Sequence, residues 1–282
     1  MIATTPAPSP PAAAPPASTR PAPMRRVVQG AFDCGSMVNR NLLLVWRNPS
    51  LVILTTIQPI LGVLLFRYVL GGAIYVPGYD YVQYLMPGIF VQTVVFGGLA
   101  TVIGFSSDIQ RGFIERFRAL PMARPAVLIG RTVADLARTA ATLTLMFVVG
   151  LLVGFEVIGN YAQVALAVLL LFLLAFAIEW IYSYVALISP NPESAQAASF
   201  PVLMVLVFAS SAFVPPDTMP DWLQVWAEHQ PVSITVDAVR ALLLDRPVDG
   251  SFWASAAWSI GIMVVFGYLS IRVYTNPRRA GR

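Results

Sequence analysis

One charged stretch reads Asp108-Ile109-Gln110-Arg111-Gly112-Phe113-Ile114-Glu115-Arg116-Phe117-Arg118-Ala119-Leu120-Pro121-Met122-Ala123-Arg124 and continues to Arg138. Long apolar segments precede and follow it, and no other stretch between apolar segments carries as many charges. Because ionised side chains are costly inside hydrocarbon, we expect this stretch to lie in water on one side of a membrane. The other segments can be placed relative to it.

The middle of this stretch has the pattern of a short amphipathic helix. Apolar residues recur at helical spacing on one face, and charged residues fall on the opposite face. The apolar face holds Phe113, Phe117 and Leu120, and the charged face holds Arg111, Glu115 and Arg118. Gly112 and Pro121 bracket the helix as stop signals. Two interpretations stay open: a solvated loop whose apolar face rests on lipid, or a docking helix that a soluble partner grips and moves.

The composition indicates an all-α polytopic membrane protein. Of 282 residues, 57% are apolar and 11% are charged, whereas soluble domains have about 25% charged residues. All 18 basic side chains are arginine, a usage typical of GC-rich bacteria, and the chain has no lysine. A phosphate-binding P-loop requires a lysine, so any ATP-driven work must use another polypeptide.

Residue types suited to catalysis or metal binding are scarce. His229 is the single histidine, Cys34 is the single cysteine, and neither a Gly-x-Ser-x-Gly nor a His-Glu-x-x-His motif is present. We therefore expect no catalytic, cofactor-binding or metal-binding residue in this chain. We attribute the net charge of +4 to orientation in the membrane and expect no nucleic-acid partner.

The chain is expected to have three parts. Residues 1–24 are rich in Ala and Pro and are expected to form a disordered cytoplasmic tail. A transmembrane domain follows over residues 25–274, and residues 275–282 form a cytoplasmic C-terminal tail. Over residues 25–47 apolar residues recur at helical spacing, with polar residues and arginines opposite, which predicts an interfacial helix on the anionic inner leaflet.

Six apolar runs are long enough to predict membrane spans, each of roughly 20 residues. They cover residues 51–69, 82–106, 136–155, 161–188, 197–214 and 252–274. The third helix is expected to start near Pro125 as a stalk outside the membrane, because Arg131, Asp135 and Arg138 can pair at i+4 and i+3.

The distribution of arginine predicts the orientation. With both termini in the cytoplasm, Arg67, Arg240 and Arg246 are the arginines that fall outside, and all others lie inside. The longest external loop, residues 215–250, is predicted to contain two short amphipathic helices separated by Pro231. Such helices either lie on the outer surface or dip into the bilayer against protein.

Polar side chains within the predicted spans raise a separate question. Glu179 is the one acidic residue well inside a span, and a carboxylate there is usually paired or lines a watery cavity. A structural glutamate, hydrogen-bonded for example to Tyr182, and a functional glutamate stay open as alternatives. Gln58 and Gln92 raise the same question, although neutral amides often just join helices. Gly98 is interpreted first as a site of close helix packing.

Several motifs occur in order along residues 24–274. They are Arg47-Asn48-Pro49, the run 58–72 from Gln58-Pro59 to Gly71-Gly72, Leu85-Met86-Pro87-Gly88-Ile89-Phe90, Arg116-Phe117-Arg118-Ala119-Leu120-Pro121-Met122, Gly130-Arg131-Thr132-Val133-Ala134-Asp135-Leu136, Asn191-Pro192-Glu193, and Phe213-Val214-Pro215 leading to Gln230-Pro231. In these motifs and their spacing the chain resembles the permease subunit of ABC type-2 exporters, in particular the daunorubicin-resistance type. The Ala/Pro-rich tail falls outside the resemblance.

The resemblance implies six spans, a connecting helix before the first, a coupling helix from Phe113 to Leu120 within the loop 108–124, and re-entrant external helices before the last span. It implies a second permease chain, identical or paralogous, and nucleotide-binding subunits that hold ATP and Mg. The positions implied to couple to the ATPase are Gly112, Phe113, Glu115, Arg116, Phe117, Arg118 and Leu120, with Asn191 and Glu193 as a smaller second contact.

We therefore hypothesise an ATP-driven exporter of a hydrophobic drug-like or lipid substrate in the bacterial cytoplasmic membrane. Candidate residues of the substrate path are Gln58, Gln92, Glu179, Gln196 and Ser199. One alternative is the same machinery exporting a lipid-linked glycan or a cell-envelope lipid. Another, from a different class, is a proton-coupled secondary transporter that uses Glu179.

Overall fold

The computed structural model describes residues 49–72, 74, 76, 78, 80–112 and 124–275, with side chains in these ranges except at 49–56, 70, 124–131, 134 and 275. The predicted N-terminal tail and interfacial helix, the central residues 113–123 and the tail from residue 276 lie outside the described residues. The described ranges are mostly helical and contain no strand.

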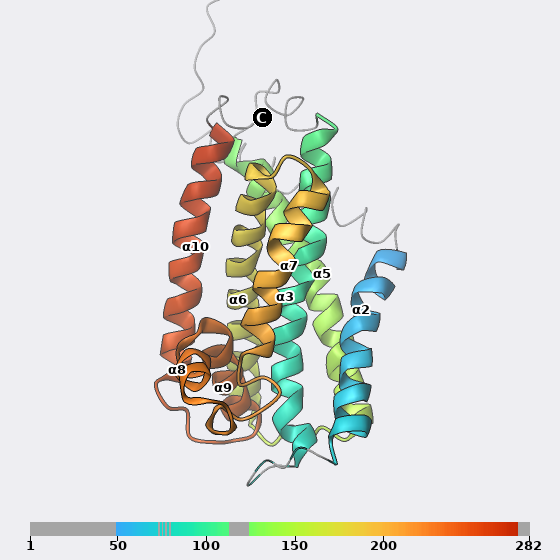
Figure 1. Ribbon diagram of the computed structural model, residues 1–282, viewed down its shortest axis with the longest axis vertical. Coiled ribbons are helices and arrows are strands. Elements are labelled where there is room, and N and C mark those ends of the chain that lie inside the picture. The colour runs from blue at the N-terminus through green and yellow to red at the C-terminus, as the bar shows by residue number, and fades with distance from the viewer. Residues whose placement is uncertain are drawn as a thin grey trace, which may run out of the picture.

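The helices form an upright bundle with two short helices at one end (Figure 1). In chain order they are α2 (Pro49–Leu64), continued by the π-helix η1 (Leu65–Leu70), α3 (Tyr81–Gln110), α5 (Arg124–Val153), α6 (Tyr161–Ile188), α7 (Pro192–Phe208), the 3-10 turn η2 (Pro216–Thr218), α8 (Asp221–His229), α9 (Pro231–Leu243) and α10 (Ser251–Thr275). We call the end where α2 begins and α10 ends the upper end. The lower end holds α8 and α9 (Figure 1).

Within the described residues, four helices are long and apolar enough to cross a membrane: Tyr81–Gln110, Asp135–Val153, Tyr161–Ile188 and Ser251–Tyr274. Two shorter apolar helices, Ile57–Val69 and Pro192–Phe208, complete the six predicted apolar segments. The expectation of an all-α polytopic membrane protein is thereby confirmed.

Helix α3 is the central element of the bundle. It packs against α2, α5, α6, α7 and α9, and it is the most buried of the four long helices. Large apolar side chains on the outer helices point away from it and are exposed, among them Leu61, Leu152, Leu169 and Val264. An apolar outer surface of this kind is stable in lipid, whereas in water it would favour aggregation.

Helices α3 and α6 approach closely at Gly98, as predicted. A methyl group on Gly98 would collide with the ring of Tyr182. The Tyr182 hydroxyl donates to the carbonyl oxygen of Val95, 2.8 Å away on α3. This hydrogen bond differs from the suggested pairing of Tyr182 with Glu179.

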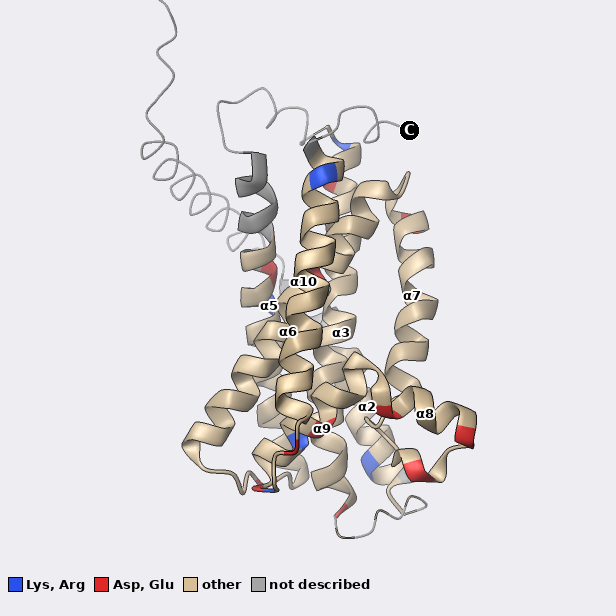
Figure 2. Ribbon diagram, turned by 90° about the vertical axis from the view of Figure 1, so that its left-hand side faces the viewer, with Lys and Arg blue, Asp and Glu red and all other residues tan. Residues whose placement is uncertain are grey.

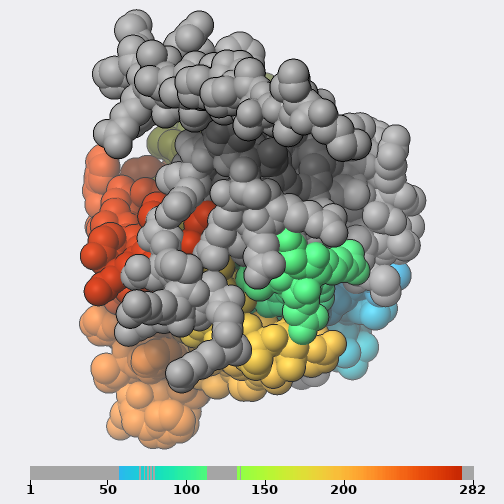
Figure 3. All heavy atoms as spheres, turned by 90° about the horizontal axis from the view of Figure 1, so that it is seen from above, coloured from blue at the N-terminus to red at the C-terminus, as the bar shows by residue number. Residues whose placement is uncertain are grey.

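Two helix ends at the upper end have clear local causes. Helix α3 ends at Gln110 and is followed by a turn at Gly112, whose positive φ of 69° is accessible to glycine at little cost. Helix α7 starts at Pro192 and is capped by Asn191, whose side-chain oxygen accepts from the Ser194 amide at 2.7 Å. Seen from above, the end of α3 (green) lies beside the start of α7 (yellow) (Figure 3).

Helix α7 ends earlier than the sequence pattern predicts. The apolar run 197–214 predicts a helix throughout, but the helix ends at Phe208 and residues 209–214 form turns. The two predicted short helices of the next loop are confirmed as α8 and α9, and they are separated at Gln230-Pro231.

The lower end of the bundle carries more acidic than basic side chains. Among the described residues, the lower end carries three arginines, Arg67, Arg240 and Arg246, and a larger set of acids (Figure 2). The acids are Asp80, Glu156, Asp217, Asp221, Glu228, Asp237, Asp245 and Asp249.

Candidate functional site

A buried arginine joins three helices within the bundle. Arg138 of α5 is 6% exposed, and its Nη2 atom donates to the Gly97 carbonyl oxygen at 3.0 Å and to Thr101 Oγ1 at 3.3 Å, both on α3. The Nη2 atom also lies 3.8 Å from Glu179 Oε1 on α6, and Nε lies 3.7 Å from Asp135 Oδ1. We call Arg138, Asp135, Glu179, Gly97 and Thr101 the arginine junction.

The junction corrects one expectation and refines another. The charged stretch 108–138 is expected in water, but Arg138 at its end is buried and serves as an interhelical link. The predicted pairing of Arg138 with Asp135 is present at i,i+3. Glu179 is 2% exposed and lies beside an arginine, which is how proteins accommodate an ionised carboxylate in low dielectric.

The other candidate path residues are not gathered into one site. Gln58 on α2 and Gln196 on α7 are exposed, whereas Gln92 on α3 and Ser199 on α7 are buried. The Ser199 hydroxyl donates to the Ala195 carbonyl within its own helix. The Oε1 atom of Gln92 is buried and finds no hydrogen-bond partner among the described residues, so Gln92 keeps an unused acceptor inside the bundle.

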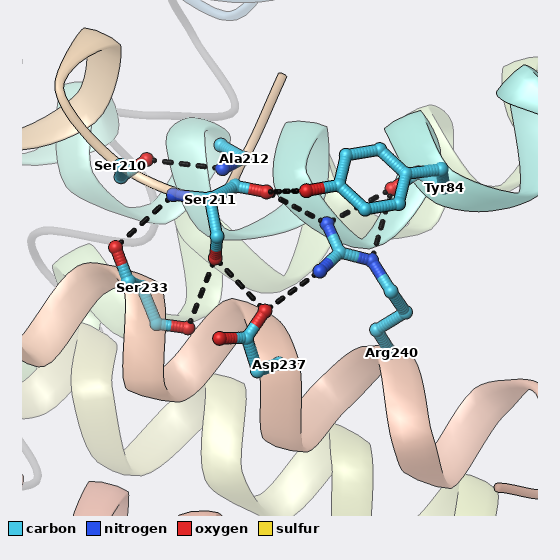
Figure 4. Close-up of polar contacts among 7 residues, drawn as sticks. All are labelled: Tyr84, Ser210, Ser211, Ala212, Ser233, Asp237 and Arg240. Atoms are coloured by element: carbon cyan, nitrogen blue, oxygen red, sulfur yellow. Dashed lines mark hydrogen bonds and ion pairs between the residues drawn. The ribbon is translucent and has the colours of Figure 1, made fainter. Parts of the chain in front are cut away.

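A second polar cluster fixes the turns after α7 at the lower end (Figure 4). Arg240 of α9 donates to the carbonyl oxygens of Tyr84, at 3.1 and 3.2 Å, and of Ser211, at 2.8 Å. It also pairs with Asp237 at 2.7 Å, and its Cζ atom lies 3.7 Å from the centroid of the Tyr84 ring. We call these four residues, with Ser233, the arginine clamp.

The clamp satisfies backbone groups that the early end of α7 leaves without helical partners. Ser211 is contacted from three directions: the Tyr84 hydroxyl donates to its carbonyl at 2.8 Å, its amide donates to Ser233 Oγ at 3.1 Å, and its hydroxyl donates to Asp237 at 2.8 Å. Gln230 adds a hydrogen bond from Nε2 to the Ala209 carbonyl at 2.7 Å. Non-helical backbone near membrane depth is tolerated when protein groups satisfy it in this way.

Gly88 of the Leu85-Met86-Pro87-Gly88 motif lies where the turns after α7 touch α3. A methyl group at Gly88 would collide with the backbone of Ala212, including its carbonyl oxygen. Packing therefore explains the glycine of the motif, since a side chain at this position would separate α3 from residues 209–214.

The clamp was not found by sequence reasoning, which placed Arg240 simply in an external loop. The signal was present: Arg240 is the one basic residue in the otherwise apolar pattern of residues 231–244, with Asp237 three positions before it. Such a pair on an apolar helix indicates an ion pair that is at least partly buried, and in the structure Arg240 is buried while the Asp237 side chain is 44% exposed.

Only some of the predicted ATPase-coupling positions lie among the residues that the structure describes. Phe113, Glu115, Arg116, Phe117, Arg118 and Leu120 lie outside the described residues. Gly112 forms the turn that ends α3, and α5 begins at Arg124, so these two helices flank the segment. Glu193 is exposed in the first turn of α7, while the Asn191 side chain caps that helix.

The described part of the chain offers no group of three or more His, Cys, Asp or Glu side chains placed to hold a metal ion. His229 is exposed, and its Nδ1 atom lies 2.9 Å from the Val225 carbonyl oxygen in the last turn of α8.

Known proteins similar to this chain are permeases. The family model described as ABC-2 type transporter matches residues 33–244. The chain is 33% identical over 231 residues to the daunorubicin resistance ABC transporter permease protein DrrB1 of Streptomyces coeruleorubidus, covering 81% of each chain. It is 28% identical over 237 residues to the probable doxorubicin resistance ABC transporter permease protein DrrC of Mycobacterium tuberculosis, covering 83% of this chain and 86% of the relative.

A more distant relative is the putative transport permease ycf38 of Cyanophora paradoxa, 26% identical over 73% of this chain and 72% of the relative. The family match covers most of the helical bundle, including the arginine junction and the arginine clamp. The resemblance inferred from the motifs is confirmed, and this chain belongs to the ABC-2 type transporter family.

Proposed function

We propose that this chain is the permease subunit of an ATP-driven exporter that moves a hydrophobic, drug-like or lipid substrate out of the cell. The observation that carries the proposal is the match, over about four fifths of both chains, to a permease named for daunorubicin resistance. A bundle whose outer helices expose apolar side chains is compatible with that role.

In this proposal ATP hydrolysis belongs to a partner. The chain has no lysine for a P-loop, so ATP and Mg are held by nucleotide-binding subunits. A second permease chain, identical or paralogous, completes the transporter. In this proposal both termini and the upper end of the bundle lie in the cytoplasm of a bacterial cell, because this orientation leaves only Arg67, Arg240 and Arg246 among the arginines of the sequence in external segments.

The path of the movement starts at residues 113–123, between α3 and α5. Closure of the ATP-binding subunits displaces this segment, and the two helices that flank it receive the displacement. Arg138 binds α5 to α3 through Gly97 and approaches Glu179 on α6. The arginine junction therefore makes three helices respond together, and Asn191 and Glu193 form a smaller contact at the start of α7.

The substrate path is proposed to pass α3 and α7, where Gln92 and Ser199 are buried and Gln196 is exposed. Gln58 on α2 belongs to the same proposed path. A lipid-linked glycan or a cell-envelope lipid is the alternative cargo for the same machinery.

A proton-coupled secondary transporter is disfavoured by the surroundings of Glu179. A carboxylate that loads and releases protons must reach water, but Glu179 is 2% exposed and lies beside Arg138.

Energised membrane vesicles provide the test. Vesicles containing this chain and its nucleotide-binding partner should accumulate an anthracycline when ATP is supplied, and vesicles with this chain alone should not. Transport by the chain alone, driven by a proton gradient, would overturn the proposal.

The docking contact is tested separately with a double variant. Glu115→Ala with Arg116→Ala should abolish export and reduce co-purification of the ATPase subunit. The matched control is Glu228→Ala with Arg246→Ala, which changes the same two charge types at the lower end and should leave co-purification intact. Equal co-purification for both double variants would remove residues 115 and 116 from the docking contact.

A further inference from the structure

Helix α8 has three chemically different faces. At about 100° per residue, Trp222, Val225 and Trp226 share one face, and they are 75%, 63% and 48% exposed. Ala227 is fully buried on a second face, where α8 packs against α9 and η2. The third face is polar, and on it Gln224 Nε2 donates to Glu228 Oε1 at 2.8 Å.

Two indole rings and a valine exposed side by side are unfavourable in water. The surface of α8 that does not pack on protein has a polar face and a face of large apolar side chains. The polar face is stable in water, but the apolar face needs a second, apolar environment. A boundary between water and hydrocarbon provides both environments at once, and tryptophan is enriched there.

The position of α8 agrees with such a boundary. It lies across the long helices at their lower end, seen end-on in Figure 1 and from the side in Figure 2. Exposed aromatic side chains mark the same end of three membrane helices: Tyr68 in η1, Tyr161 at the start of α6 and Trp253 at the start of α10. The apolar face of α8 thus continues the aromatic border of the lipid-facing surface.

The charges on α8 indicate which kind of lipid surface it fits. Asp221 and Glu228 are exposed at its two ends, Asp217 precedes it, and α8 has no arginine. Attraction to anionic headgroups requires basic side chains, so the helix fits a membrane surface through its apolar face alone.

We propose that α8 lies in the interfacial layer of the leaflet at the lower end, with Trp222, Val225 and Trp226 inserted among phospholipid headgroups and upper acyl chains. In the orientation proposed above this is the outer leaflet. The inference rests on the geometry of α8 and holds whatever cargo the transporter moves.

Anchoring has a structural consequence for α7. The last turn of α8 leads into Gln230, whose amide donates to the Trp226 carbonyl and whose Nε2 atom holds the Ala209 carbonyl just after α7. Insertion of α8 therefore fixes the depth at which α7 ends.

Spin labels on single cysteines measure the environment of each face. Cys34→Ser removes the one native cysteine, and Trp222→Cys, Val225→Cys, Gln224→Cys and Glu228→Cys are then introduced one at a time. The full-length protein is reconstituted into vesicles of phosphatidylcholine, and again with added phosphatidylglycerol. Collision of the label with oxygen and with a water-soluble nickel chelate is compared.

Labels at 222 and 225 should collide more with oxygen than with the nickel chelate, and labels at 224 and 228 should show the reverse, in both vesicle types. Nickel accessibility at 225 equal to that at 228 would place the face in water and overturn the proposal. Low accessibility to both reagents at 225 would show that protein, such as a second copy of this chain, covers the face, and would also overturn it. Insertion that requires phosphatidylglycerol would contradict the charge argument.

Discussion

Arg138 Nη2 lies 3.8 Å from Glu179 Oε1, and this contact joins α5 to α6 inside the bundle. The same nitrogen donates to the Gly97 carbonyl of α3 at 3.0 Å. One guanidinium therefore contacts three helices, two of which flank the segment proposed to receive the movement of the ATPase. Stability and transport should both depend on it.

Replacing Arg138 with methionine should lower stability strongly, because Glu179 is left as a buried charge without its arginine. The cost of breaking a buried ion pair is about 3–5 kcal/mol. Arg138→Met with Glu179→Met should cost less than the sum of the single variants, since both charges are removed. The midpoint of thermal unfolding in detergent provides the measurement.

Arg67→Met is the matched control for the arginine junction. Arg67 pairs with Asp80 at 3.5 Å on the surface, where such pairs contribute about 0–1 kcal/mol. Equal loss of stability for Arg67→Met and Arg138→Met would contradict a special role of the junction. If Glu179→Gln retains full export, the glutamate is structural.

Adding one methyl group should have opposite effects at two helical glycines. Gly88→Ala forces the Ala212 backbone away from α3 and should destabilise by about 1–3 kcal/mol. Gly261→Ala in α10, which has no atom within 4 Å of the added methyl, should be neutral or stabilise by about 0.5–1 kcal/mol. The midpoint of thermal unfolding of each variant measures the effect. Equal midpoints for Gly88→Ala and Gly261→Ala would contradict the close approach of Gly88 to the Ala212 backbone.

Loss of the arginine clamp should loosen the turns after α7. Arg240→Gln removes donors to the Tyr84 and Ser211 carbonyls, and amide hydrogen exchange over residues 209–214 should accelerate. Tyr84→Phe removes one hydrogen bond to Ser211, whose carbonyl keeps Arg240, so its effect should be smaller, about 1 kcal/mol. Unchanged exchange in Arg240→Gln would show that the clamp does not hold this segment.

The turn at Gly112 should discriminate between substitutions by backbone conformation. At a φ of 69°, alanine is expected to cost about 1–2 kcal/mol, whereas asparagine tolerates this region. Gly112→Ala should therefore reduce export more than Gly112→Asn, because a strained turn misdirects the segment that follows α3. Export assays at matched protein levels measure the difference, and equal activity would show that the turn does not position the segment.

The cap at Asn191 offers a way to separate structure from partner contact. Asn191→Ala removes the acceptor for the Ser194 amide and should cost about 1 kcal/mol, while Asn191→Asp keeps an acceptor. If Asn191→Asp retains stability but loses ATPase coupling, the residue touches the partner as well. Retention of both properties limits it to the cap.

The sequence predicted the helices well where apolar runs are long and uniform. Residues 161–188 were expected as a span and form α6 over that range, and the run 252–274 differs from α10 by one residue at each end. Helix propensity and the need to bury backbone groups in lipid act in the same direction there.

Apolar pattern alone could not predict where α7 ends. Residues 209–214 are apolar enough to continue the helix, but Arg240 and Gln230, more than 15 positions later in sequence, supply hydrogen bonds to the turn carbonyls. Gly88 is likewise part of a sequence motif, but the need for glycine at this position comes from the backbone of Ala212, which is distant in sequence.

The burial of Arg138 could not be predicted from the sequence pattern either. Asp135 and Arg131 precede it at helical spacing, so the sequence pattern groups it with a solvated stretch. Its burial follows from a glycine and a threonine on α3 and an acid on α6, which no local window contains.

The 17 residues of α7 make a helix of about 25 Å, shorter than a typical hydrocarbon layer of about 30 Å. Around this helix the bilayer must be thinner, unless the folded turns held by Arg240 complete the crossing. Hydrophobic mismatch of this kind makes a protein sensitive to acyl-chain length. Membranes of shorter-chain lipids should therefore suit this transporter better than thick, rigid ones.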